Sequence, residues 1–312
     1  MKNSLFFCLI ASFLMISCAS NPPKVVKQVV RDTVIINTVT DKYESARVAK
    51  LNKSVISTSH YPAAGQDERV RFLILHYTAL DNYKSIDVLT HQEVSAHYLV
   101  PDDFTDSIYV LVDETKRAWH AGASYWKGIN NINFSSIGIE IVNQGYTTTT
   151  PVSGNPDLAV ANRYFYDFPQ KQIDKVAELA LDIIQRYKID PVNVLAHSDV
   201  APQRKHDPGP KFPWKKLYTD YGIGAWYEDA QKNIYLSQFP YLEKDSASFI
   251  LSVQNDFEKY GYEIQKTGIW DEQTKKVITA FQYHFRPERY DGIMDAETWA
   301  ILKALILKYR NK

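Results

Sequence analysis

Cysteine is nearly absent from this chain. Its 312 residues include only Cys8 and Cys18, and both lie among the first 18 residues. The rest of the chain therefore excludes a disulfide framework, a cysteine zinc knuckle, an iron–sulfur cluster and a catalytic thiol. An excess of charge of one sign is also lacking, since 36 Lys and Arg balance 36 Asp and Glu. This balance excludes a strongly basic nucleic-acid binder as a description of the whole chain, and no nucleic-acid or protein partner is expected.

Long apolar runs are equally scarce, and the one near the N-terminus is short. Residues 5–16 form a mostly apolar run behind Lys2. A membrane-spanning helix needs about 20 apolar residues, so this run fits the core of a secretory signal better than a span. The run ends in Met15-Ile16-Ser17-Cys18, which resembles a bacterial lipobox, although that pattern prefers Leu where Met15 stands. The resemblance implies a signal peptide at 1–17 and lipidation of Cys18. The alternative is an ordinary signal peptide cleaved near Ala19.

The lipobox reading predicts a protein of the cell envelope. Acyl chains on Cys18 would anchor the chain in a membrane, facing the periplasm. We expect the outer membrane, because Ala19 follows Cys18 instead of the Asp associated with inner-membrane retention. Residues 18–57 have no helical period and open on two prolines, so they are expected to form a tether.

The middle of the chain has the pattern of an α/β domain. A length of 312 residues suggests about two domains. Residues 69–77, 136–143 and 192–197 are apolar or alternating and predict strands, whereas 85–94 and 171–187 have helical periodicity. Strands and helices in this order predict a mixed central sheet with flanking helices, over residues 58–220.

Polar side chains stand where two of these strands end. His76 closes the first strand, His197 closes the third, and Asp207 follows in a proline-rich loop. Two imidazoles and one carboxylate from separate strand ends match a catalytic zinc site, which uses three nitrogen or oxygen ligands and leaves a position for water. Spacing alone leaves the alternative open, since a histidine at a strand end is more often a satisfied core residue.

Longer residue strings point to a known family. FLILHYTA (72–79), SAHYLV (95–100), AWHAG (118–122), SIGIEI (136–141) and AHSDVAPQRKHDPGPKFPW (196–214) occur in this order. Together they resemble the zinc-dependent N-acetylmuramoyl-L-alanine amidases of the type-2 family, and most closely the envelope lipoprotein branch. The resemblance covers about residues 58–220.

The resemblance implies a role for each matched position. His76, His197 and Asp207 correspond to the zinc ligands, Glu140 to the catalytic carboxylate, and Lys205 to the residue that steadies the developing oxyanion. A buried ion pair is the alternative for Glu140, and a solvent-facing side chain is the alternative for Lys205.

His206 could compete with Asp207 as a ligand because the two are adjacent. Adjacent residues in an extended loop point to opposite sides, so only one should reach the metal. Asp207 is favoured because the DPGP string fixes its position. The matched strings also make His97, Trp119 and His120 candidate substrate-binding residues. The two histidines are expected in the pocket wall or in a supporting position behind the ligands, and core packing is the alternative for Trp119.

The C-terminal part of the chain predicts a small all-α domain over residues 245–312. Helical periodicity covers 248–260, 274–285 and 296–309. GIWDEQT (268–274) and DGIMDAET (291–298) share a Gly-Ile phrase that is followed by an acidic residue and Thr. This pseudo-repeat resembles the three-helix peptidoglycan-binding domain, with a generic helical bundle as the alternative. Residues 221–244 are expected to be a linker.

The expected function is zinc-dependent hydrolysis of the amide bond between N-acetylmuramic acid and L-alanine in peptidoglycan, for cell-wall turnover or remodelling. The alternative is a non-catalytic, peptidoglycan-binding lipoprotein that acts as a sensor or wall anchor. A serine hydrolase has no support, since no G-x-S-x-G string is present.

Overall fold

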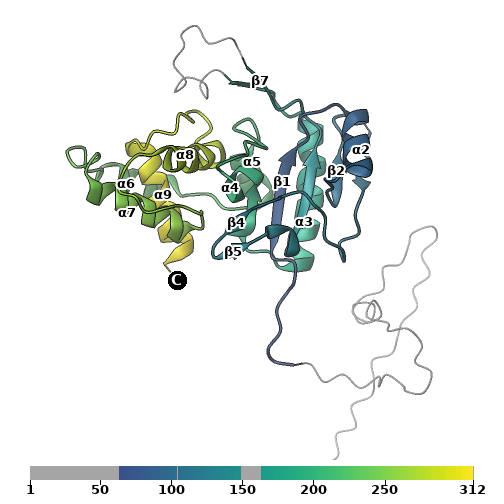
Figure 1. The fold of residues 1–312 in the computed structure, drawn as a ribbon, viewed down its shortest axis with the longest axis horizontal. Helices are drawn as coiled ribbons and strands as arrows, with labels where there is room; N and C mark the ends of the chain where they lie inside the picture. The colour runs from purple at the N-terminus through teal and green to yellow at the C-terminus, as the bar shows by residue number, and fades with distance from the viewer. Residues whose placement is uncertain (1–62, 104, 149–162, 312) are drawn as a thin grey trace, which may run out of the picture. The chain divides into compact units, whose positions relative to one another are not determined.

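A computed structural model describes residues 63–103, 105–148 and 163–311 (Figure 1). The predicted signal peptide, the tether and Cys18 lie outside the described residues. Residues from Gly65 onward form one compact unit. Within the described part of the chain, every helix is too short or too polar to cross a membrane.

A five-stranded mixed sheet forms the centre of the N-terminal part. Its strand order is β3-β2-β6-β1-β9, and all neighbours are parallel except β3, which runs antiparallel to β2. The strands are β1 (Phe72–Tyr77), β2 (Tyr98–Val100), β3 (Tyr109–Val110), β6 (Ser136–Ile141) and β9 (Val194–Ala196). Leu73, Ile74 and Leu75 of β1 are completely buried, as expected for a central strand covered on both faces. The predicted fold class is confirmed.

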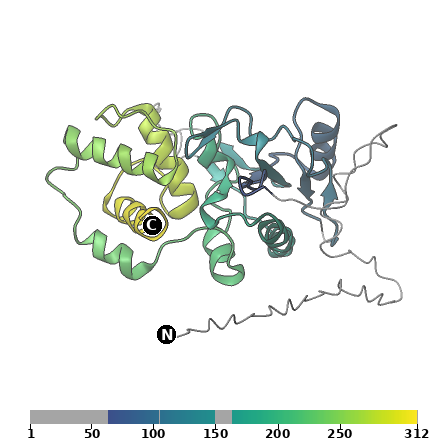
Figure 2. The same ribbon diagram turned by 90° about the horizontal axis from the view of Figure 1, so that it is seen from below.

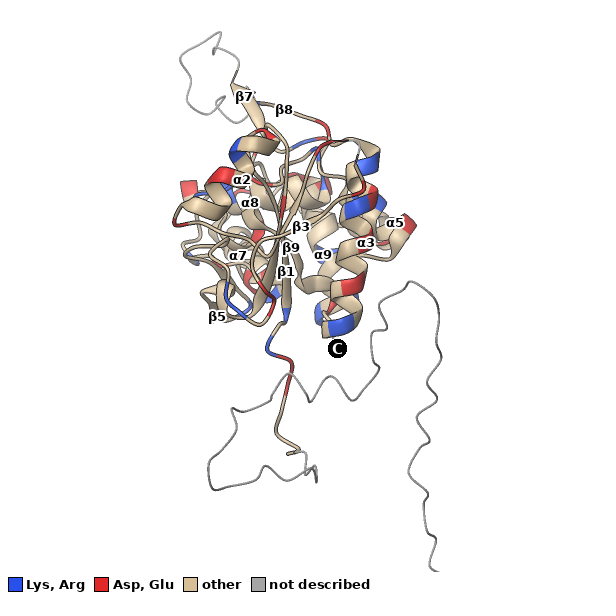
Figure 3. Cartoon of the chain, turned by 90° about the vertical axis from the view of Figure 1, so that its right-hand side faces the viewer, with Lys and Arg blue, Asp and Glu red and all other residues tan. Residues whose placement is uncertain are grey.

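Helices lie against this sheet. They are α2 (Asn82–His91), α3 (Gln170–Tyr187), α4 (His197–Val200) and α5 (Trp214–Tyr221). The amphipathic helix α3 starts directly after Pro169 and packs on β1 and β2. Short elements complete this part: β4 (Tyr125–Trp126), β5 (Ile129–Asn130), η1 (Ile132–Phe134), β7 (Tyr146–Thr148), β8 (Arg163–Phe165) and η3 (Pro191–Asn193). Basic and acidic positions are interspersed along the helices, in line with the zero net charge (Figure 3).

The C-terminal part is helical, as predicted (Figure 2). It contains α7 (Ala247–Tyr260), α8 (Glu272–Phe285) and α9 (Ala296–Arg310). Each begins behind a side chain that accepts a hydrogen bond from the backbone of the first turn, supplied by Ser246, Asp271 and Asp295 in turn. The predicted linker holds a further helix, α6 (Asp229–Leu236), which packs on α9.

Two buried glutamines explain the pseudo-repeat. The carbonyl oxygen of Gln254 accepts a hydrogen bond from the backbone of Gly268 at 3.0 Å, and its amide donates to the Thr274 hydroxyl at 2.9 Å. Gln282 repeats this arrangement: it accepts from the Gly292 backbone at 2.8 Å and donates to a threonine hydroxyl one helix further on. The repeated phrase therefore encodes a connector folded around a glutamine of the preceding helix.

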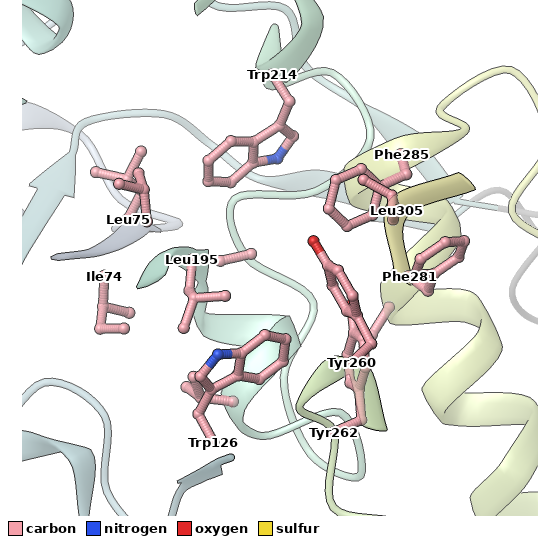
Figure 4. Packing of buried hydrophobic residues seen from close by; sticks show 14 of the residues in the cluster. Ile74, Leu75, Trp126, Leu195, Trp214, Tyr260, Tyr262, Phe281, Phe285 and Leu305 are labelled. Atoms are coloured by element: carbon pink, nitrogen blue, oxygen red, sulfur yellow. The ribbon is translucent and has the colours of Figure 1, made fainter. Parts of the chain in front are cut away.

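The hydrophobic core continues from the sheet region into the helical region (Figure 4). Trp126 is completely buried, and its ring centroid lies 4.9 Å from that of Tyr262 and 5.9 Å from that of Tyr260. Between the two tyrosines, a Cβ on Gly261 would lie 2.6 Å from the Trp126 ring, so this position requires glycine. The two regions are therefore packed as one body.

Candidate active site

Strand register brings the candidate residues together. His76 of β1 pairs with Glu140 of β6, and paired residues of parallel strands point to the same face of a sheet. On the other side of β1, Leu75 pairs with Ala196 of β9, so the next residue, His197, lies beside His76. His197 is the first residue of α4 and not the last residue of a strand, a one-position difference from the sequence prediction.

Three potential ligand atoms meet at one point. The Nδ1 atoms of His76 and His197 are 2.9 Å apart, and Asp207 Oδ2 lies 3.0 Å from the first and 2.9 Å from the second. All three residues are buried. Among the described residues, these three form a group whose ligand atoms are close enough to hold one metal ion.

The far sides of both imidazoles are occupied by protein atoms. His197 Nε2 lies 3.1 Å from the carbonyl oxygen of Ala121, so this nitrogen carries the proton and donates it. His76 Nε2 lies 3.0 Å from His120 Nδ1, and His120 Nε2 lies 3.1 Å from the Ser136 hydroxyl. With each ring donating outward, both Nδ1 lone pairs face the Asp207 carboxylate. This is how supporting residues orient metal-binding histidines.

The charge states suit ligands. Burial, followed by the neighbouring His197, lowers the pKa of His76 to about 4, so its imidazole is neutral at neutral pH. Imidazole nitrogens and a carboxylate oxygen are donors that zinc accepts.

Glu140 lies beside this group of three residues. Its Oε1 lies 3.9 Å from His76 Nδ1, and its buried Oε2 has no hydrogen-bond partner among the described residues. Burial, followed by the negative charge of Asp207, raises the pKa of Glu140 well above its ordinary value. The partner required by a buried ion pair is therefore missing, and the carboxyl is available to a molecule in the pocket.

The site opens into a cavity of about 220 Å³. Glu140, Lys205, His197 and Asp207 line it, together with Trp119 and His120. Trp119 is 54% exposed, and the Arg117 guanidinium stacks on its ring at 3.8 Å. Trp119 is thus a surface residue of the cavity rather than part of the core. A larger cavity, of about 550 Å³, lies between residues 200–204 and the helical region and is lined by none of the three potential ligands.

Of the two positions expected for His97, the structure shows the supporting one and not the pocket wall. It is completely buried, its Nδ1 accepts a hydrogen bond from the Gly138 backbone at 3.1 Å, and its Nε2 lies 3.2 Å from the carbonyl oxygen of Lys116. Both nitrogens are engaged by protein, so His97 fixes β6 instead of contacting substrate. The lack of a side chain at Gly138 has a clear reason, because a Cβ there would lie 2.4 Å from the His120 ring.

His206 points away from the three potential ligands. Its ring packs edge-on against Tyr146 and Tyr283, with centroids 6.0 Å and 6.2 Å away. Burial lowers its pKa to about 4. The opposite orientation of neighbouring residues in this loop thus leaves Asp207 beside the two histidines.

Sequence reasoning missed several supporting residues. The Arg204 guanidinium donates to the carbonyl oxygens of Ala121 and Ala123, and so ties the loop that orients His197 to the loop that carries Asp207. Arg204 lies inside the long matched string and could have been found there. Ser136, by contrast, carries no signal beyond its place at the start of a strand.

The fold and the site define a class of amide-hydrolysing enzymes. The family described as N-acetylmuramoyl-L-alanine amidase matches residues 66–210, and the family described as a peptidoglycan-binding domain matches residues 246–302. N-acetylmuramoyl-L-alanine amidase AmiD of Escherichia coli is 43% identical over 247 residues, which cover 77% of this chain and 84% of that protein. The chain therefore belongs to the N-acetylmuramoyl-L-alanine amidase family.

Solved structures agree. The structure of E. coli AmiD in complex with anhydro-N-acetylmuramic acid-L-Ala-D-γ-Glu-L-Lys matches with a TM-score of 0.70 and 39% identity, covering 81% of this chain and 94% of that one. AmpDh3 of Pseudomonas aeruginosa in complex with anhydromuramic pentapeptide matches with a TM-score of 0.72 and 42% identity, covering 83% and 99%. The prediction of an amidase followed by a peptidoglycan-binding domain is confirmed.

Proposed function

We propose that this protein is a zinc-dependent hydrolase of the amide bond between N-acetylmuramic acid and L-alanine, acting in turnover or remodelling of the cell wall. One observation carries the proposal: Glu140 lines the cavity beside the point where His76, His197 and Asp207 meet, with Oε1 3.9 Å from His76 Nδ1 and with Oε2 lacking a hydrogen-bond partner among the described residues. A non-catalytic wall binder would have no use for that arrangement. The muramyl peptides bound in the two solved complexes support the proposed bond.

The donor set fits a zinc ion. His76 Nδ1, His197 Nδ1 and Asp207 Oδ2 would hold it, since their lone pairs converge and their outer atoms are fixed by other hydrogen bonds. Zinc supplies Lewis acidity when bound, which polarises a carbonyl oxygen and lowers the pKa of water. Three acceptor atoms about 3 Å apart repel one another without a shared cation, so the arrangement itself favours a metal ligand set.

The remaining steps belong to side chains of this chain. Glu140 takes a proton from the attacking water at its free oxygen and returns it to the leaving nitrogen of L-alanine as the C–N bond breaks. Its raised pKa brings the carboxyl toward the range in which one group serves as base and then as acid. Lys205 lines the same cavity and supplies a positive charge for the developing oxyanion. Trp119 offers an exposed ring on which a sugar or peptide can pack.

The location belongs to the same proposal. Lipidated Cys18 would anchor the protein in the outer membrane, with the enzyme facing the periplasm. The helical region, which matches a peptidoglycan-binding family, would bind the wall. Two attachments raise the local concentration of substrate at the site without any new contact there.

The proposal is tested with a soluble N-acetylmuramoyl-L-alanyl peptide and the full-length chain. We expect release of a peptide with a free L-alanine amino group, loss of the activity after chelation, and its recovery when zinc is added. Binding of the fragment without cleavage in the presence of zinc would favour the non-catalytic alternative.

A further inference from the structure

We propose that the helical region is a structural part of the metal site: Tyr262 and His284 hold the Asp199 carboxylate, and Asp199 in turn positions His197. This inference rests on the proposed function, because it assigns positioning residues to the same site. It gives the C-terminal region a role beyond contact with the wall.

Asp199 lies at the boundary of the two regions and is completely buried. Its Oδ1 accepts a hydrogen bond from the Tyr262 hydroxyl at 2.6 Å, and its Oδ2 accepts from His284 at 2.7 Å. A carboxylate can only accept, so His284 donates through Nδ1. The third donor is the Ala196 backbone, at 2.8 Å from Oδ2. A buried carboxylate with three donors is fully compensated, and loss of any donor leaves part of its charge unpaired.

Asp199 reaches His197 through the local backbone. Ala196 ends β9 and His197 begins α4, so the hydrogen bond from Ala196 to Asp199 fixes the turn at which the ligand leaves the sheet. The next residue, Ser198, donates its backbone NH to the Asp207 carbonyl oxygen at 3.0 Å and ties the second ligand to the same turn. A helix of four residues has little stability of its own, so its geometry depends on such anchors.

Both partners also pack against aromatic rings of the sheet region. The His284 ring stacks on Trp214 at 3.8 Å with 20° between the planes. The Tyr262 ring meets Trp126 edge-on at 4.9 Å, and both donors are almost entirely buried. Rigid donors on one region and a ligand-bearing turn on the other make Asp199 the joint between them.

The experiment compares two buried tyrosines of the full-length chain. Tyr262→Phe removes one hydroxyl that donates to Asp199, whereas Tyr260→Phe is the matched control, since it removes a neighbouring hydroxyl and leaves all three hydrogen bonds to Asp199 in place. Zinc affinity is measured by competition with a chromogenic chelator. The visible absorption of the Co²⁺-substituted protein reports the ligand geometry, and thermal unfolding of the metal-free protein reports stability.

We expect Tyr262→Phe to weaken zinc binding about tenfold, the low end of the range for residues that support metal ligands, and to change the Co²⁺ absorption. Tyr260→Phe should leave both unchanged. Asp199→Asn, which keeps the size of the side chain, should weaken zinc binding further, because an NH₂ group then faces the Ala196 donor.

Unchanged zinc affinity and Co²⁺ absorption in both Tyr262→Phe and Asp199→Asn would overturn the inference. Equal effects of the two tyrosine variants, in proportion to lost stability, would overturn it as well, since the role would then be general packing. A wild-type chain that binds no zinc would instead contradict the proposed function, which separates the two failures.

Discussion

Two buried aspartates, eight positions apart, behave in opposite ways. Asp199 is surrounded by donors, and each of its oxygens accepts a hydrogen bond from a proton that the protein supplies. Asp207 faces two imidazole nitrogens whose protons are on the far sides of the rings, so the three atoms that meet there are all lone-pair donors. The first arrangement is complete without any ligand, and the second is complete only with a cation.

The difference shows how one short segment can carry both support and function. Residues 196–207 contribute two of the three potential ligands and also the carboxylate that is locked to the helical region. The neighbouring hydrogen bonds to Asp199 hold the segment in place, so the three potential ligands can stay close together although their lone pairs repel one another. Strain or an unpaired group at a site persists only where the surroundings hold it in place.

The largest effect is expected from substitution of Asp207, the aspartate that faces only lone-pair donors. Asp207→Ala removes the anionic ligand, so the purified protein should lose its single zinc ion and all turnover. His206→Ala is the matched control, because this neighbour packs against Tyr146 and Tyr283 and should leave the zinc content unchanged. Metal analysis of both variants checks the prediction, and the reverse result would exchange the roles of the two residues.

Next in size is the loss of the proton-transferring group without loss of the metal. Glu140→Gln keeps the shape of the side chain but cannot take a proton, so turnover should fall by a factor of about 10² to 10⁴. Zinc content and binding to isolated peptidoglycan should stay at the wild-type level. Full activity of this variant in the soluble-fragment assay would refute the proposed role of Glu140.

Substitution of Asp199, the aspartate with three hydrogen-bond donors, is expected to lower the stability of the fold. Asp199→Ala leaves the donors of Tyr262, His284 and Ala196 buried without a partner, so the free energy of unfolding should fall by about 2 to 4 kcal/mol. Denaturant unfolding in the presence of a chelator removes any contribution of metal binding. Asp220→Ala is the control, since Asp220 is exposed and pairs only with neighbours on the surface of α5. A loss of unfolding free energy no larger than that of the control would show that Asp199 does not link the sheet region to the helical region.

The smallest effect is expected at a third carboxylate, Glu114, which can be compared with Asp199. Glu114 resembles Asp199, because Arg186, Tyr98 and Tyr187 all donate to it. Burial opposes its ionisation, but these donors outweigh burial and lower its pKa to about 2 from an ordinary value of 4.5. Ionised Glu114 therefore contributes stability above about pH 4.5, and this contribution is lost as the pH falls toward 2.

Glu114→Gln should flatten the decline in unfolding free energy over this acid range, by on the order of 1 to 2 kcal/mol after allowance for the exposure of Arg186. Acid titrations of unfolding for the wild type and the variant provide the measurement. Parallel curves would show that Glu114 does not titrate with a lowered pKa.

Much of the fold could be predicted because its signals are local. The buried strand ending in His76, the alternating strand containing Glu140 and the amphipathic helix α3 each carry their own periodicity. The convergence of His76 and His197 followed from a simple rule: the ends of neighbouring parallel strands lie together. The potential ligands could therefore be predicted from the sequence.

The rest could not be predicted because it depends on packing between distant segments. Tyr262 and His284 lie 63 and 85 residues from Asp199, and no local pattern marks them as its partners. The matched string left His97 either in the pocket wall or in a supporting position, and only the structure decides between them, since its nitrogens bind the backbone of two other segments. Helix α6 was expected to be part of a linker, because a pattern of eight residues is too short to indicate a stable helix. Its stability comes from contact with α9, which the sequence does not reveal.

Digestion of purified, intact peptidoglycan by the full-length protein tests the central claim most directly. With zinc present, we predict that the products are intact peptides with free L-alanine amino groups, together with glycan strands that carry no new reducing ends. New reducing ends would show cleavage of the glycan, peptides cut internally would show a peptidase, and an undigested wall would leave only a binding protein. Any of these results would contradict the account.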